Sequence, residues 1–167
     1  MELKVKLFAD GADKKGILEM YKNPVIAGFT TNPTLMKMAG VKDYKSFAKE
    51  ILSFIKDKPI SFEVFSDDLD QMKEQALQIA SWGSNVNVKI PVTNTRGQSC
   101  AELIKDLSNQ GVKINVTAIM TIEQVKNILP GLAQGVGGYI SIFAGRIADS
   151  GLDPLPIMKE AVHSLDW

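Results

Sequence analysis

The chain has 167 residues, and 45% of them are hydrophobic, which is enough for one domain with a sizeable core. Lysine plus arginine and aspartate plus glutamate number 19 each, so the charge balance argues against a nucleic acid or an anionic membrane surface as the main partner. The single cysteine, the mixed composition of residues 1–10 and the lack of a bilayer-length apolar run predict a cytoplasmic protein with neither a secretory signal nor an internal disulfide.

Strand-like and helix-like patterns alternate along the whole chain. In chain order they predict a strand at Leu3–Ala9, a helix at Asp13–Tyr21, a strand at Val25–Phe29, helices at Thr34–Met38 and Tyr44–Ile55, a strand at Ile60–Phe65, a helix at Leu69–Trp82, a strand at Asn85–Val92, a helix at Cys100–Asn109, a strand at Val112–Thr117, a helix at Ile122–Leu129, a strand at Gly138–Phe143 and a helix at Pro154–Ser164. Strands that alternate with helices indicate βαβ crossovers and a parallel sheet.

Side-chain spacing also predicts how individual helices begin and which face they bury. Asp13 and Thr121 are placed to cap the helices that follow them. In the helix at 44–55, the spacing predicts a core-facing side formed by Phe47, Ile51, Phe54 and Ile55.

Polar residues gather on one face of the strands near their carboxyl ends. Alternation assigns to that face the pairs Ser61 and Glu63, Asn87 and Lys89, Asn115 and Thr117, and Ser141 and Phe143. The opposite face of each strand is apolar, whereas the inner strands of a doubly wound sheet are apolar on both faces. A polar inner face and an apolar outer face therefore favour a (β/α) barrel, with its chemistry at the carboxyl ends of the strands.

Lys89 is the most unusual of these residues, because it lies within an otherwise apolar strand. A lysine held in a dry pocket loses proton affinity, and its neutral amine can attack a carbonyl to form a Schiff base. The alternative is an edge strand whose lysine extends its charged end into solvent.

Schiff-base chemistry also needs proton donors and acceptors, and three residues at neighbouring strand ends could supply them. Glu63 and Asp10 are candidate acids and bases, and Thr117 is placed to hold a water molecule. Alternatively, Glu63 only neutralises Lys89 and Asp10 only caps the turn that follows it.

Two further segments have both a functional and a structural interpretation. Thr30, Thr31 and Asn32 precede a helix and could be substrate-binding or merely turn and capping residues. After the last strand, Arg146 could bind a phosphate, or it could face solvent and pair with a nearby aspartate, Asp149 or Asp153. Cys100 is interpreted as structural, and His163 is assigned no role.

Taken together, these segments resemble the transaldolase family, in particular its short branch, which includes fructose-6-phosphate aldolase-like enzymes. The matching segments occur in family order over nearly the whole chain: Phe8-Ala9-Asp10, Gly28-Phe29-Thr30-Thr31-Asn32-Pro33-Thr34, Phe62-Glu63-Val64, Val88-Lys89-Ile90-Pro91, Asn115-Val116-Thr117-Ala118 and Phe143-Ala144-Gly145-Arg146-Ile147.

The resemblance implies a (β/α)8 barrel and a class I mechanism without a metal or cofactor. Lys89 would form the Schiff base, Asp10 would act as acid and base at the cleaved bond, and Glu63 and Thr117 would hold the water of imine formation. The expected substrate-binding residues are Thr30, Thr31, Asn32, Asn87, Asn115, Ser141, Phe143 and Arg146.

Two positions separate the branches of the family. The aldolase branch typically has Gln where this chain has Glu63 and Tyr where it has Phe143, so the resemblance implies a transaldolase of the pentose phosphate pathway. Such an enzyme would pass a dihydroxyacetone unit from a ketose phosphate to an aldose phosphate. An aldolase that uses free dihydroxyacetone and a non-catalytic phosphosugar-binding relative are the alternatives.

Six βα units are visible, whereas the family's barrel has eight. Residues 1–167 are therefore expected to form a single barrel domain that lacks the C-terminal two units, including a seventh strand whose Ser completes the phosphate site. Because such a sheet exposes two edges, we expect a chain of this length to fold poorly, aggregate or be closed by a partner chain in a homo-oligomer.

Overall fold

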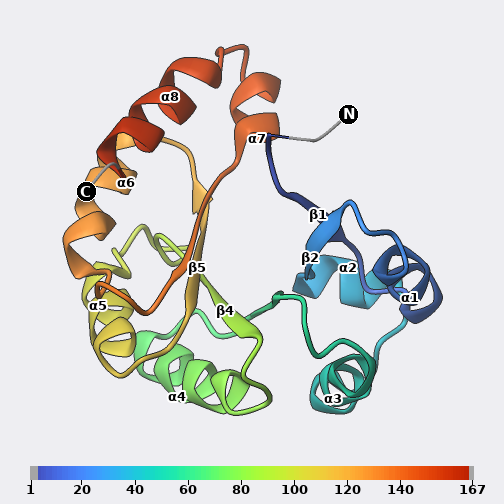
Figure 1. Cartoon of the computed structure of the whole chain (residues 1–167). Coiled ribbons are helices and arrows are strands. Elements are labelled where there is room, and N and C mark those ends of the chain that lie inside the picture. The colour runs from blue at the N-terminus through green and yellow to red at the C-terminus, as the bar shows by residue number, and fades with distance from the viewer. Residues whose placement is uncertain (1–3, 166–167) are drawn as a thin grey trace.

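The strands of the computed structural model, which describes residues 4–165, pair in the order in which they occur in the chain (Figure 1). All neighbouring pairs are parallel. The strands are β1 (Leu7–Asp10), β2 (Ile26–Thr30), β3 (Ile60–Glu63), β4 (Val86–Pro91), β5 (Ile114–Ile119) and β6 (Gly138–Ile142). The helices are α1 (Lys14–Tyr21), α2 (Pro33–Met38), α3 (Tyr44–Phe54), α4 (Leu69–Ala80), α5 (Ala101–Asn109), α6 (Ile122–Ile128), the 3-10 turn η1 (Leu129–Gly131), α7 (Ala144–Asp149) and α8 (Leu155–Ser164).

The sheet curls into a partial barrel with the helices outside it (Figure 1). A doubly wound sheet would reverse its strand order at some point, and this sheet does not. The prediction of a partial (β/α)8 barrel is therefore confirmed. Within residues 4–165, β1 and β6 each pair on one side only.

The two faces of the sheet differ as the alternation of residues predicts. The outer face contributes Phe62, Val88 and Val116 to the apolar core beneath the helices, and all three are completely buried. The inner face carries polar side chains that are also buried, namely Ser61, Asn87, Lys89, Asn115 and Thr117. Burying polar groups costs free energy unless they form hydrogen bonds with one another or with a ligand. The barrel interior is therefore the candidate binding site.

Side chains from the first and last strands meet inside the barrel. The rings of Phe8 and Tyr139 lie edge to face with their centroids 5.2 Å apart. Phe8 can occupy this position because Gly28 on β2 has no side chain: a Cβ there would lie 2.4 Å from the Phe8 ring and 2.8 Å from the carbonyl oxygen of Pro59. Close approach, rather than an unusual backbone conformation, therefore requires glycine at position 28.

The structure differs most from the sequence predictions at two places, and the other predicted element ends agree with it within two residues. The first strand begins at Leu7 instead of Leu3, because it pairs only with β2, whose first paired residue is Ile26. Val5 is accordingly exposed, and Leu3 lies outside the described residues. Residues 144–149, which the sequence suggests are a ligand-binding segment after β6, form the short helix α7.

The predicted helix caps are confirmed, but one predicted core residue is not. Asp13 accepts a hydrogen bond from the backbone N–H of Gly16, and Thr121 forms a reciprocal capping box with Gln124. Phe54 is 48% exposed, because α3 buries the side formed by Ala48, Ile51 and Leu52.

Candidate active site

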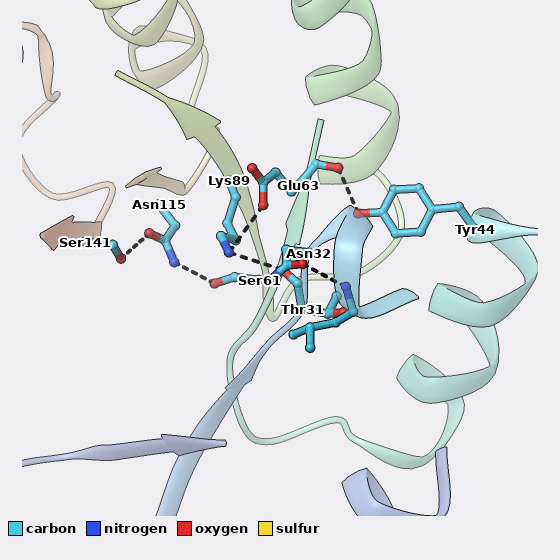
Figure 2. Close-up of polar contacts among 9 residues, drawn as sticks. Thr31, Asn32, Tyr44, Ser61, Glu63, Lys89, Asn115 and Ser141 are labelled. Carbon is cyan, nitrogen blue, oxygen red and sulfur yellow. Dashed lines mark hydrogen bonds and ion pairs between the residues drawn. The ribbon is translucent and has the colours of Figure 1, made fainter. Parts of the chain in front are cut away.

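Lys89 lies in the middle of the sheet with its amine inside the barrel (Figure 2). Its strand, β4, pairs with β3 and β5, so the alternative of an edge strand with a solvated lysine is wrong. The residue is 8% exposed. Its Nζ lies 3.3 Å from a carboxylate oxygen of Glu63 and donates a hydrogen bond of 3.2 Å to the carbonyl oxygen of Thr31.

Glu63 faces Lys89 because the two residues are directly paired between β3 and β4. Burial raises the pKa of the Glu63 carboxyl above its usual range, although the positive charge of Lys89 opposes that shift. The ion pair that the structural interpretation predicts is therefore present. A carboxyl with a raised pKa next to an amine is also placed to exchange a proton with it.

Asp10 approaches the same amine from β1. Its side chain is exposed, yet partial burial of the carboxyl raises the pKa of Asp10. The charge of Lys89 and the backbone N–H of Gly11 oppose the rise. The two carboxyl groups thus approach one lysine from different strands.

A cavity of about 440 Å³ opens beside the Lys89 amine. It is lined by Phe8, Asp10, Thr30, Asn32, Lys89, Asn115, Thr117, Tyr139, Ile140, Ser141, Ile142 and Phe143. Eight of the residues predicted for the site therefore share one cavity. Glu63 contacts Lys89 from the side and is not part of that lining.

A chain of hydrogen bonds crosses the inner face of the sheet (Figure 2). The Ser141 hydroxyl donates to the amide oxygen of Asn115 at 2.7 Å, and the Asn115 amide nitrogen donates to the Ser61 hydroxyl at 3.1 Å. These bonds connect β3, β5 and β6 and fix the orientation of the Asn115 amide. Asn87 lies opposite Ser61, two residues before Lys89 on β4, and does not line the cavity.

Thr117 faces the cavity by the regular alternation of β5, and an irregularity follows directly after it. The pairing of β5 with β6 shifts between Val116 and Ile119, and Ala118 adopts a left-handed conformation with φ 60°. The extra residue lets Val116 and Ile119 both point into the core while Thr117 points inward. The Thr117 hydroxyl is buried and has no hydrogen-bond partner among residues 4–165, so it is available to a ligand or a water molecule.

The segment after β2 fits both the capping and the substrate-binding interpretation of its residues. The Asn32 amide oxygen caps α2 by accepting a hydrogen bond of 2.9 Å from the N–H of Leu35, as the structural interpretation predicts. Asn32 also lines the cavity, where its amide nitrogen can bind a ligand. Thr31 is placed differently from the prediction: it contributes its carbonyl oxygen to Lys89, and its side chain does not line the cavity.

Arg146 belongs to an adjoining, shallower depression. It lies on α7, is exposed, and contacts the Asp149 carboxylate at 3.4 Å, which is the solvent-facing pair that the sequence offers as an alternative. A cavity of about 450 Å³ is lined by Arg146, Gly145 and Phe143, and Phe143 also lines the Lys89 cavity. Such an exposed pair is worth little energy, so a phosphate could displace it.

Comparison with known proteins identifies a family. Residues 7–165 match the family model described as Transaldolase/Fructose-6-phosphate aldolase. The chain belongs to this family. It is similar to proteins named probable transaldolase from Dehalococcoides mccartyi (35% identical, covering 95% of this chain and 69% of that protein), Streptococcus agalactiae serotype V (35%, 98% and 71%) and Streptococcus pyogenes serotype M1 (38%, 97% and 71%).

Some residues around this transaldolase-family site were not singled out from the sequence. Phe8 and Tyr139 line the cavity as aromatic residues of the inner face, which strand alternation alone could have indicated. Tyr44 contacts the backbone of Glu63 from α3, and only its position just after the capping residue Asp43 hints at this.

Three further observations concern the cysteine, metal binding and membrane spans. Burial raises the pKa of the Cys100 thiol to about 11, which fits its structural interpretation. Within the described part of the chain, no three His, Cys, Asp or Glu side chains gather as possible ligands of a metal ion. No helix of residues 4–165 has the length and apolar composition needed to cross a membrane.

Proposed function

We propose that the chain is a transaldolase that transfers a dihydroxyacetone unit between sugar phosphates through a Schiff base on Lys89. The main support is the Lys89 amine, which is buried, opens onto a cavity of about 440 Å³ and has a carboxylate 3.3 Å away. An amine in this setting is suited to nucleophilic attack on a carbonyl carbon.

In the proposed reaction, Lys89 adds to the ketose carbonyl, and the carbonyl oxygen then leaves as water. Glu63 supplies the proton for that departure, and its raised pKa suits the task. The unpartnered hydroxyl of Thr117 holds the water that is released and later used for hydrolysis.

Asp10 acts at the carbon–carbon bond. It removes the proton from the hydroxyl group beside that bond, the bond breaks, and its electrons pass to the imine to form an enamine while an aldehyde departs. The enamine then attacks the acceptor aldehyde, and Asp10 returns the proton. Partial burial, which raises the pKa of Asp10, helps the group both to accept and to release this proton.

Sugar phosphates fit the polar lining of the cavity. We propose that Asn32, Asn115 and Ser141 bind the sugar hydroxyls and that Arg146, released from Asp149, binds the phosphate. Thr30 lines the cavity beside them. The pentose phosphate pathway as setting, the cytoplasm as location, a single barrel domain over residues 1–167 and assembly into a homo-oligomer are parts of the same proposal.

Borohydride reduction in the presence of fructose 6-phosphate tests the central step. We expect the sugar fragment to become fixed to the peptide that contains Lys89, as detected by mass spectrometry. Lys89→Arg should give no adduct, since guanidinium stays protonated. Lys113→Arg is a matched control, because the Lys113 amine only contacts the Ser84 carbonyl oxygen outside the cavity. A folded wild-type chain that gives no adduct at Lys89 would refute imine chemistry and favour a binding protein.

An aldolase that releases free dihydroxyacetone is the second candidate, because the family description covers both activities. Glu63 and Phe143 are the transaldolase choices at the two positions that separate the branches. We therefore expect transfer to erythrose 4-phosphate to be faster than release of dihydroxyacetone. Faster release, measured by product analysis, would favour the aldolase.

A further inference from the structure

Tyr44 contacts Glu63, the acid that pairs with Lys89, from a helix outside the barrel. It is the first residue of α3, whose start is fixed by Asp43 accepting a hydrogen bond from the N–H of Ser46. The Tyr44 hydroxyl donates a hydrogen bond of 2.9 Å to the backbone carbonyl oxygen of Glu63 (Figure 2). The first residue of α3 thus reaches the carboxyl end of β3.

The Glu63 carbonyl needs such a partner because the neighbouring strand has ended. The pairing of β2 with β3 stops at Thr30, which is opposite Ser61. On the other side, the backbone N–H of Val64 donates to the Lys89 carbonyl oxygen at 3.1 Å. The end of β3 is thus held by a strand on one side and by a phenol on the other.

The phenol itself is held firmly by aromatic packing. The Tyr44 ring makes edge-to-face contacts with Phe62, Phe65 and Trp82, with centroid separations of 6.0, 4.6 and 5.2 Å. Burial also raises the pKa of the Tyr44 hydroxyl well above its usual range, so it stays a hydrogen-bond donor. The ring can shift little without disturbing three neighbours.

We infer that Tyr44 is a positioning residue that holds the carboxyl end of β3 so that the Glu63 carboxylate lies against Lys89. Its effect on the reaction rests on the proposed function, whereas its effect on the Glu63–Lys89 contact does not. Tyr44 does not line the cavity, and its hydroxyl bonds the backbone of Glu63, so it acts through that backbone.

Tyr44→Phe is the direct test, since it keeps the ring contacts and removes only the hydroxyl. Tyr21→Phe is a matched control: the Tyr21 hydroxyl also donates a hydrogen bond, but to the Asp57 carboxylate at the surface. We expect Tyr44→Phe to slow borohydride-trapped imine formation at Lys89 by about two- to tenfold, the fold-change that corresponds to one net hydrogen bond. The donor concentration for half-maximal rate should not change, and Tyr21→Phe should match the wild type.

A second readout does not depend on catalysis. The Glu63 carboxyl can be followed by carbon NMR during a pH titration, with Glu63→Gln to assign its signal. Lys89 lowers the pKa of Glu63 and Asp10 raises it, so a carboxylate that moves away from Lys89 should titrate at higher pH. We expect this upward shift in Tyr44→Phe and not in Tyr21→Phe.

The outcomes separate the two proposals. If wild-type protein traps no imine but Tyr44→Phe still shifts the Glu63 titration, the proposed function fails and the positioning role stands. If folded Tyr44→Phe leaves both the titration and the trapping rate unchanged, the positioning role is refuted. Should Tyr44→Phe unfold, 4-aminophenylalanine at position 44 keeps a weaker donor on the same ring. An intermediate shift in its Glu63 titration would then support the inference, and no shift would refute it.

Discussion

Replacing Lys89 by methionine should destabilise the fold by an amount that grows with pH. Methionine keeps much of the apolar stem but removes the charge that lies 3.3 Å from the Glu63 carboxylate. Burial already raises the pKa of Glu63 above its ordinary value of 4.5, and the charge of Lys89 is the largest influence that opposes this rise. Without that charge, the buried carboxyl in the folded state should take up a proton rather than remain an unpaired anion.

The size and sign follow from proton linkage. Above pH 4.5 the unfolded chain has released the Glu63 proton while the folded variant retains it, so the free energy of unfolding falls as pH rises. Retaining that proton at pH 7, 2.5 units above 4.5, costs at most about 3.4 kcal/mol at about 1.36 kcal/mol per unit. At pH 5 the same calculation gives about 0.7 kcal/mol.

Urea denaturation at pH 5, 6 and 7 measures this effect in four proteins: wild type, Lys89→Met, Glu63→Gln and the double variant. We expect the loss caused by Lys89→Met to increase with pH. In the Glu63→Gln background, the stability loss caused by Lys89→Met should increase with pH by a smaller amount. The increase that remains comes from Asp10, whose pKa Lys89 also lowers. An equal loss at pH 5 and pH 7, or a full pH dependence in the double variant, would refute the reasoning.

Three further substitutions test the framework of the barrel by urea denaturation. Gly28→Ala should cost about 1–3 kcal/mol, because its Cβ would overlap the Phe8 ring; a neutral result would mean that the ring moves freely. At Ala118, with φ 60°, glycine should be tolerated or gain up to about 1 kcal/mol, while valine should lose stability; the reverse order would contradict the left-handed assignment. Asn85→Ala removes the donors to two backbone carbonyl groups and should cost about 1–3 kcal/mol; no loss would show that water replaces them.

Much of the site could be predicted because strand alternation is a local property. Once β3, β4 and β5 are recognised as parallel neighbours, Glu63, Lys89 and Thr117 fall on one face, and their place at the carboxyl ends brings them together. The same alternation places Asn115 and Ser141, and the structure joins them by a hydrogen bond.

The remaining features depend on contacts between distant segments. Tyr44 belongs to the site's surroundings only because β2 ends early and leaves the Glu63 carbonyl without a strand partner. The irregularity at Ala118 interrupts the alternation of β5 just after Thr117, and an alanine does not indicate a positive φ in the sequence. Helix α7 has only six residues and no capping side chain, so the sequence contains no periodic pattern that predicts it.

The sequential strand order also bears on how the protein is made. Glu63 pairs with Lys89 and Lys89 with Asn115, and the residue numbers differ by 26 in both cases. Each new βα unit can therefore dock onto a preceding strand soon after it leaves the ribosome, since its partner has already been synthesised. The contact between Phe8 and Tyr139 spans 131 residue numbers and has to wait until β6 emerges. The aromatic contact that connects the two edges of the sheet is thus set late in biosynthesis, after the strand that carries Lys89 has found both of its neighbours.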